Sequence, residues 1–145
     1  MKSKLVHSAH GQRTYVVVLD TGDEVRECLH RFAQQENLAA AQVTAIGAFQ
    51  RAVFRYFDWE SKQYQPINVK EQVEVVSLNG DIAQDRQGQP KLHLHAVLGR
   101  RDGAAMGGDL KEGHVRPTLE VIITESPAHL RRVEDPETGL ALIRL

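Results

Sequence analysis

Alternating apolar and polar residues dominate the chain and predict β-strands along most of its length. Runs rich in β-branched and aromatic residues predict strands over 13–20, 39–46, 48–59, 62–69, 73–78, 92–98 and 114–124. Asn79-Gly80 favours a turn and predicts the end of the strand 73–78, which leaves 81–84 as a strand of minimal length. Both ends of the chain are polar, so we expect the core to span about residues 13–130.

One stretch has helical rather than β periodicity. Its apolar residues recur at spacings of three and four and are Val25, Cys28, Leu29, Phe32 and Ala33. This spacing predicts an amphipathic helix that runs to about Asn37, with Thr21 or Asp23 as its N-cap. Glycine-punctuated strands with a single helix favour an α+β fold, in which the helix packs on a largely antiparallel sheet.

Length and composition fit one domain, residues 1–145, since 41% of the residues are hydrophobic and 26% are charged. The net charge of −1 excludes a strong bulk attraction to nucleic acid, so any DNA contact requires a local patch. Cys28 is the only cysteine, which excludes an internal disulfide and favours a reducing compartment. The N-terminal residues lack the apolar core of a signal peptide and no run suits a membrane helix, so we expect a cytoplasmic protein.

Residues 91–124 hold the candidate chemistry, because three histidines recur there in strand-like runs. Side chains alternate between the two faces of a strand, so His93 and His95 share the face opposite the core residue Leu94. His114 opens the next predicted strand. If the two strands are neighbours, the third imidazole lies alongside the first two.

Three imidazoles with an open fourth position are the ligand set of many zinc sites, and the same set accepts iron, nickel or copper. We therefore expect a divalent transition metal, zinc before the others. The expected ligands are His93, His95 and His114. Asp109 or Glu120 could add a carboxylate, either as a further ligand or as the acceptor that orients an imidazole. The competing interpretation is that His-x-His forms a half-exposed polar face without a metal.

The glycine-rich link predicted over 99–113 gathers the one modest group of basic residues. Its members and near neighbours are Arg100, Arg101, Lys111 and Arg116. A solvated loop accounts for them, although Arg116 or Arg100 could neutralise a small anionic ligand beside a metal. Residues 106–109 are expected to form a tight turn. No serine or cysteine nucleophile stands in a recognisable motif, so an enzyme here would need metal-activated water or a redox metal.

Two blocks of sequence resemble a known family. VEVVSLNGDIA at 73–83 and LHLHAVLGRRDGAAMGGDLKEGHVRPTLEVIIT at 92–124 closely resemble the PPC domain, the plant and prokaryote conserved domain, in its stand-alone bacterial form. The resemblance covers about residues 13–130. It implies an α+β fold with an antiparallel sheet, a homotrimer, and an association with DNA. In the plant members DNA contact is attributed to an AT-hook with an Arg-Gly-Arg core, and this sequence contains no such tripeptide.

Family members often carry histidine at the position of Asp109, so the resemblance implies that a ligand there is altered to a carboxylate. Our leading hypothesis is a homotrimeric regulatory or DNA-associated binding protein with a histidine metal site near a subunit boundary. The alternative is a metal-dependent enzyme that acts on a small anionic substrate. A third reading is a trimeric scaffold without metal.

Overall fold

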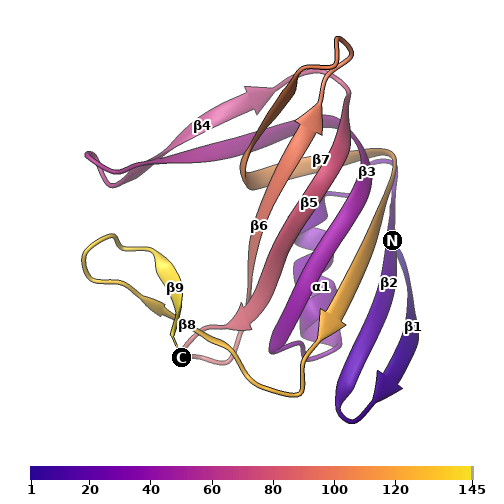
Figure 1. Ribbon diagram of the computed structural model, residues 1–145, viewed down its shortest axis with the longest axis vertical. Helices are drawn as coiled ribbons and strands as arrows, with labels where there is room; N and C mark the ends of the chain where they lie inside the picture. The colour runs from indigo at the N-terminus through magenta and orange to yellow at the C-terminus, as the bar shows by residue number, and fades with distance from the viewer. Residues whose placement is uncertain (145) are drawn as a thin grey trace.

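The computed structural model describes residues 1–144, in which nine β-strands accompany one α-helix (Figure 1). In chain order the elements are β1 (Lys2–Ala9), β2 (Gln12–Asp20), α1 (Val25–Gln35), β3 (Ala40–Asp58), β4 (Gln63–Val69), β5 (Val73–Gln84), β6 (Pro90–Gly99), β7 (Ala105–Glu125), β8 (Arg131–Glu134) and β9 (Ala141–Arg144). The expected α+β class with a largely antiparallel sheet is broadly confirmed, but strands outweigh the single short helix by far.

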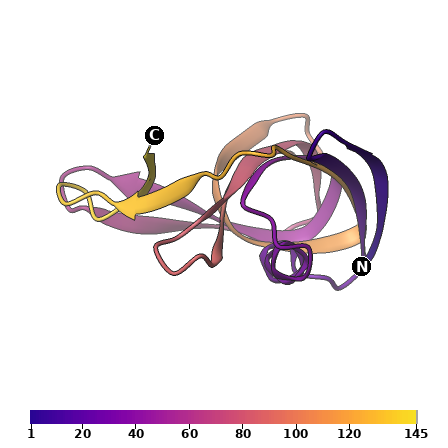
Figure 2. The ribbon, with the colours of Figure 1, turned by 90° about the horizontal axis from the view of Figure 1, so that it is seen from below.

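All of the strands belong to one sheet, whose main path runs β1-β2-β7-β3-β5-β8-β9. Its pairings are antiparallel except for a single parallel pair between β5 and β8. β4 pairs with β3 alone, whereas β6 pairs with both β5 and β7. Because β3 also pairs with both β5 and β7, these four strands form a closed circuit of hydrogen-bonded neighbours. Figure 2 shows the resulting strong curl of the sheet.

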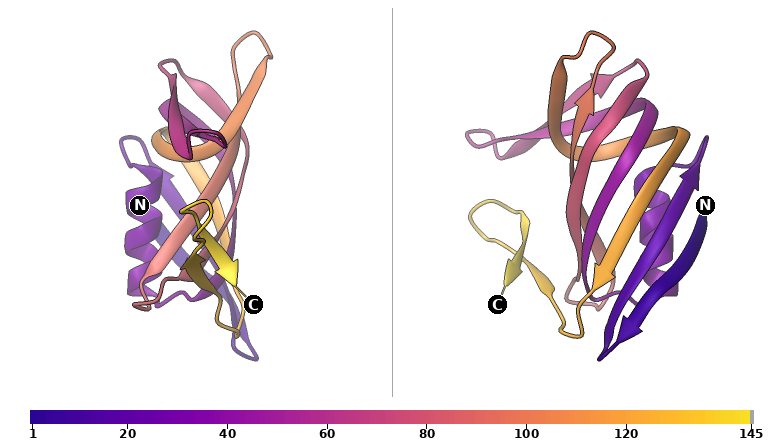
Figure 3. Two further views of the ribbon diagram at one scale, coloured as in Figure 1. Left: turned by 90° about the vertical axis from the view of Figure 1, so that its left-hand side faces the viewer. Right: turned by 45° about the vertical axis from the view of Figure 1, so that its right-hand side comes forward.

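The helix covers one side of this curled sheet (Figure 3). Glu24 is its N-cap: one side-chain oxygen accepts from the Glu27 amide at 2.8 Å, and the other accepts from the Gly113 amide of β7 at 2.9 Å. The same carboxylate therefore caps α1 and ties it to the sheet. Tyr15 and Phe32 meet edge to face between sheet and helix. Within residues 1–144, no helix has the length and apolar character required to cross a bilayer.

Apolar and polar residues alternate along the long strand β7, so one face of the strand packs on the core. Its residues Val115, Leu119, Val121 and Ile123 are fully buried, as the predicted strand faces require. Gly47 lets β3 approach it closely, since an added Cβ would stand 2.3 Å from the Thr118 carbonyl oxygen.

The structure corrects several predicted boundaries. Asn79-Gly80 does not end a strand, because β5 continues to Gln84. Gly80 instead lets β5 and β6 lie close together, since a Cβ there would stand 2.1 Å from the His93 carbonyl oxygen of β6. The predicted link 99–113 is mostly strand, so residues 106–109 lie in β7 rather than in a tight turn.

Both polar ends also form strands. β1 pairs with β2 at the N-terminal end, and β8 and β9 form a hairpin near the C-terminal end. This hairpin and the β3–β4 hairpin both project from the same side of the sheet, next to β6 (Figure 1). We name the two projections the C-terminal hairpin (β8–β9) and the arm (β3–β4).

Candidate metal centre

The candidate centre lies on β6, between β5 and β7. His93 stands opposite Asp81 of β5, and His95 stands opposite Asp109 of β7. Directly opposed residues project to the same face of a sheet. Both imidazoles consequently share a face with two carboxylates that come from different neighbouring strands.

Ligand atoms of His93, His95 and Asp109 all lie within 4.8 Å of one another. The two Nε2 atoms are 3.1 Å apart, and Nε2 of His93 is 3.8 Å from Oδ2 of Asp109. Tetrahedral zinc with bonds of about 2.0–2.1 Å requires its ligand atoms to be about 3.3 Å apart. The observed separations bracket that value, so the three groups need little movement to share one ion.

Asp109 is the most enclosed member of the cluster, with 6% of its surface exposed. Arg55 of β3 directs both Nε, at 2.8 Å, and Nη2, at 2.6 Å, to Oδ1 of this carboxylate. Oδ2 is the oxygen that faces His93. The guanidinium of Arg55 also lies 4.3 Å from the centre of the Tyr64 ring in the arm. Arg55 thereby compensates the buried charge and fixes the orientation of the carboxylate.

His93 is held on its other side by a second ion pair. Asp81 Oδ2 lies 4.0 Å from its Nδ1, while Asp81 Oδ1 accepts from Arg132 Nη2 at 2.6 Å. Burial lowers the pKa of His93, and the nearby charge of Arg132 lowers this pKa further. Since a metal binds the neutral imidazole, both causes favour the ligand form of His93 at neutral pH.

A cavity of about 300 Å³ adjoins the cluster between the arm and the C-terminal hairpin. Its polar lining comprises Arg55, Lys91, His93, Asp109 and Arg132. Its less polar wall comprises Tyr64, Leu92, Gly139, Leu140, Ala141 and Leu142. The candidate centre is therefore open to a space large enough for a small molecule.

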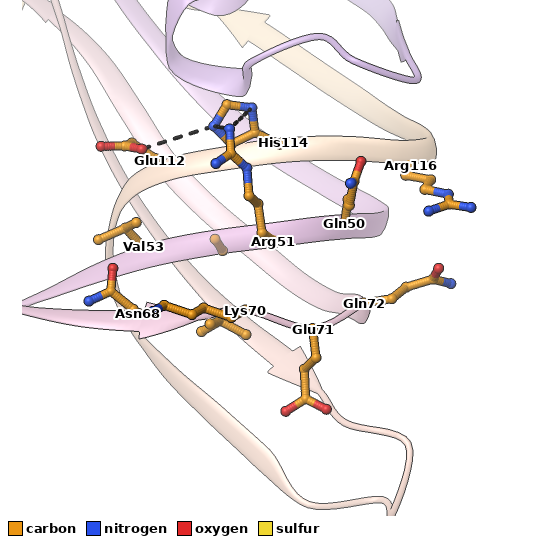
Figure 4. Close-up of a pocket in the computed structure, with 12 residues that line it drawn as sticks. Gln50, Arg51, Val53, Asn68, Lys70, Glu71, Gln72, Glu112, His114 and Arg116 are labelled. Carbon is orange, nitrogen blue, oxygen red and sulfur yellow. Dashed lines mark hydrogen bonds and ion pairs between the residues drawn. The ribbon is translucent and has the colours of Figure 1, made fainter.

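His114 does not join this cluster within the chain. It pairs with Arg51 of β3, whose Nη2 lies 3.2 Å from its Nε2, and Glu112 lies 3.9 Å away. These side chains line a separate cavity of about 350 Å³ (Figure 4). The sequence suggested that His114 starts the strand beside β6, but β7 begins at Ala105 and only its first residues pair with β6.

The remaining predicted site residues also lie outside the cluster. Glu120 is exposed and pairs with Val18 and Ile46 on either side of β7. Arg100 forms an ion pair with Glu71, with 2.8 Å between Nε and the carboxylate oxygen. Arg116 is exposed, lines the cavity beside His114, and points away from that imidazole (Figure 4).

Three charged residues of the centre were not predicted, namely Arg55, Asp81 and Arg132. The sequence offered a weak signal for Asp81 alone, which follows the Asn-Gly pair and has the same parity as Asn79 along the strand. Arg55 and Arg132 come from distant segments, 54 and 51 residues from their partners Asp109 and Asp81. Such contacts depend on the register of the sheet rather than on any local pattern.

The donor set fits a divalent transition metal. Two imidazole nitrogens and one carboxylate oxygen form the protein ligands of one common class of catalytic zinc sites and of non-haem iron sites. The buried, oriented carboxylate and the nitrogens that face each other meet the geometric requirement. A bound ion would act here as a Lewis acid, held by His93, His95 and Asp109.

Fold and cluster together define a small, β-rich, single-helix domain with a candidate metal centre on its sheet. The profile of the Plants and Prokaryotes Conserved (PCC) domain matches residues 6–127, and the chain belongs to this family, the PPC family of the sequence resemblance.

Three solved structures support this assignment. A plant- and prokaryote-conserved protein of Pyrococcus horikoshii is 30% identical and has a TM-score of 0.85, with 92% of each chain covered. A metal-containing protein of Archaeoglobus fulgidus is 29% identical with a TM-score of 0.84, covering 99% of this chain and 97% of its own. A protein of Ralstonia eutropha JMP134, named as a candidate DNA-binding protein, is 30% identical with a TM-score of 0.83 and 90% coverage of each chain.

One curated relative is much longer. The bifunctional protein GlmU of Synechococcus sp. (strain JA-3-3Ab) is 30% identical over 130 residues, which are 88% of this chain. The match spans 20% of that relative's length.

Proposed function

We propose that this PPC-domain protein binds a divalent transition metal, zinc before the others, through His93, His95 and Asp109. The observation that carries the proposal is the convergence of three ligand atoms within 4.8 Å on one face of β6. A simple hydrogen bond between the two imidazoles would explain their contact, but it would not explain a buried carboxylate turned toward them. The similar protein of Archaeoglobus fulgidus, named as metal-containing, supports the proposal.

Elemental analysis of protein purified without an affinity tag tests this proposal. The wild type should contain about one equivalent of metal per chain, and a His93→Ala, His95→Ala double variant should contain almost none. His114→Ala is the matched control, because His114 lies in another cavity and its loss should leave the metal content unchanged. Equal metal in the double variant and the wild type would exclude the site. Loss of metal in the His114→Ala variant would instead support the ligand set expected from the sequence, which includes His114.

We further propose that the chain assembles as a homotrimer through the exposed face of its sheet. Four large apolar side chains are exposed there: Ile46 at 60%, Val76 at 59%, Val97 at 43% and Ile122 at 42%. Three of them, Ile46, Val76 and Ile122, line one shallow depression across β3, β5 and β7. An apolar surface of this kind is typical of a protein interface.

Light scattering coupled to size exclusion tests the assembly. The wild type should elute with a mass of about three chains, and Ile46→Lys should reduce that mass by placing a charge in the interface. Leu5→Lys is the control, since Leu5 is also exposed but lies on β1 at the sheet's edge. A monomeric wild type would contradict the proposal.

A second candidate function is contact with DNA, as the name of the Ralstonia eutropha protein suggests for that relative. Arg51, Lys70 and Arg116 line the cavity beside His114 and are exposed. Among residues 1–144, none of these three has a carboxylate within 4 Å. Cations that are not paired with a carboxylate are available to phosphate groups.

A duplex titration at two salt concentrations tests this function. Binding should weaken as salt rises, and should weaken further in the variant Arg51→Gln, Arg116→Gln. The control Lys4→Gln removes an exposed charge from β1, away from that cavity. Absence of binding even at low salt would remove DNA from the functions of this chain. The metal-dependent enzyme on a small anionic substrate stays a prediction of the sequence.

A further inference from the structure

Arg132 in the C-terminal hairpin carries a buried donor without a partner. The residue is 7% exposed. Nη1 donates to the Ala141 carbonyl oxygen at 2.7 Å, and Nη2 donates to Asp81 at 2.6 Å. Nε is fully buried and has no hydrogen-bond partner within the described part of the chain. A buried N–H of a charged group is costly to leave unsatisfied, so such an atom indicates a missing acceptor.

The same arginine lines the cavity of about 300 Å³ beside the candidate metal centre. Arg55 and Lys91 line it as well, so three cationic side chains surround one small space. Leu92, Leu140 and Leu142 form apolar parts of its wall. Cations combined with aliphatic side chains suit a compact ligand that has an anionic head and a short apolar body.

Protein charges alone are balanced around this space. Arg55 is paired with Asp109, Arg132 with Asp81, and Lys91 with Asp85 at 3.4 Å. An ion bound by the candidate centre would therefore leave an excess of positive charge next to the cavity. An anion would be attracted by that excess, most strongly where water is partly excluded.

We propose that this cavity binds a small organic carboxylate with a short aliphatic body, and that a small displacement of the C-terminal hairpin lets Nε of Arg132, which is buried in this structure, donate to its carboxylate. The inference rests on the proposed function, because the bound metal supplies the excess charge. A planar guanidinium with one free N–H matches an oxygen of a carboxylate in geometry and in charge. Binding also brings the C-terminal hairpin, which carries Arg132, Leu140 and Leu142, into contact with the ligand.

NMR of the ¹⁵N-labelled, zinc-loaded protein tests the proposal, since an arginine Nε–H gives its own resonance. Isobutyrate is the probe, and inorganic phosphate is the comparison for an oxyanion without an apolar body. The Nε–H resonance of Arg132, assigned by its loss in Arg132→Lys, should shift saturably with isobutyrate. The same titration of metal-free protein should give binding weaker by about tenfold or more.

Two variants separate binding in the cavity from other causes. Leu142→Trp fills part of the cavity while keeping both Asp81 and Arg132, and it should weaken isobutyrate binding about tenfold or more. Arg131→Lys is the control, because Arg131 is exposed and does not line the cavity, and its affinity should equal that of the wild type.

Each outcome is decisive. No saturable shift in zinc-loaded protein overturns the anion site while leaving the metal site intact, and it assigns the free Nε to water. Equal affinity in Leu142→Trp overturns it too, because binding would then lie elsewhere. Tighter binding of phosphate than of isobutyrate overturns the carboxylate class. A chain that takes up no zinc and binds no isobutyrate overturns both the proposed function and this inference.

Discussion

Replacing Arg55 by methionine probes how the protein prepares Asp109 for a metal. Methionine keeps an unbranched apolar stem that can lie against Tyr64, but it removes the two N–H groups that hold Oδ1. Asp109, only 6% exposed, would lose its counter-charge and its fixed orientation together. We expect the affinity for zinc to fall about 10- to 100-fold, or about 1.4–2.8 kcal/mol, the usual effect of losing a group that orients a ligand.

An opposing effect makes the sign of this prediction informative. The positive charge of Arg55 repels a cation, so its removal would by itself tighten binding. Arg55 is 29% exposed, however, and solvent screens its long-range repulsion, whereas its contacts with the carboxylate are direct. A carboxylate buried without a counter-charge also tends to take up a proton, which competes with the metal. The loss of orientation should therefore exceed the loss of repulsion.

Competition with a chromophoric zinc chelator at pH 7.5 measures the effect. Arg51→Met is the matched control, because Arg51 lies on the same strand but contacts His114 rather than the cluster. The control should bind zinc as the wild type does. Unchanged or tighter binding in Arg55→Met would refute the reasoning, since it would mean that Asp109 needs no support or that charge repulsion dominates.

Three further predictions concern stability and reactivity. Because burial lowers the pKa of His93, the folded state disfavours protonation of this imidazole, and metal-free wild type should lose unfolding free energy as pH falls below about 6.5. Urea unfolding at pH 7.5 and 5.5 measures the loss, which should be smaller in His93→Gln. Glu125→Gln weakens a buried carboxylate that accepts from Arg13 and the Ala39 amide, so unfolding free energy should fall by about 1–3 kcal/mol, against almost no change in Glu120→Gln. Burial raises the pKa of the Cys28 thiol, so iodoacetamide should alkylate it far more slowly in native than in urea-unfolded protein; equal rates would contradict its burial.

Local pattern was sufficient for the elements whose burial follows a simple period. The apolar spacing of Val25 to Ala33 predicted α1, and alternation predicted which face of β7 is buried. The same reasoning was wrong at Gly80, because one sequence signal serves both turns and close strand contacts. Only the neighbouring backbone of β6 distinguishes the two uses, and that neighbour lies more than ten residues away in the sequence.

The prediction of the site also succeeded where it depended on local pattern and failed where it depended on strand register. The spacing of two between His93 and His95 correctly predicted that they share a face, since the period of a strand requires it. The third partner depends on register, and β7 places Asp109 rather than His114 opposite β6. The resemblance to the PPC family had already marked Asp109 as the unusual position. No feature of the sequence indicated which arginine would accompany it.

The two histidines lie between two aspartate–arginine ion pairs that are built in the same way. Each neighbouring strand of β6 contributes an aspartate, and each aspartate is held by an arginine that arrives from a different part of the chain. Arg55 belongs to the arm and Arg132 to the C-terminal hairpin, so both projections are tied to the centre. Metal and ligand would bind where these ties meet. A metal ion bound at the centre should therefore restrain the motion of both the arm and the C-terminal hairpin.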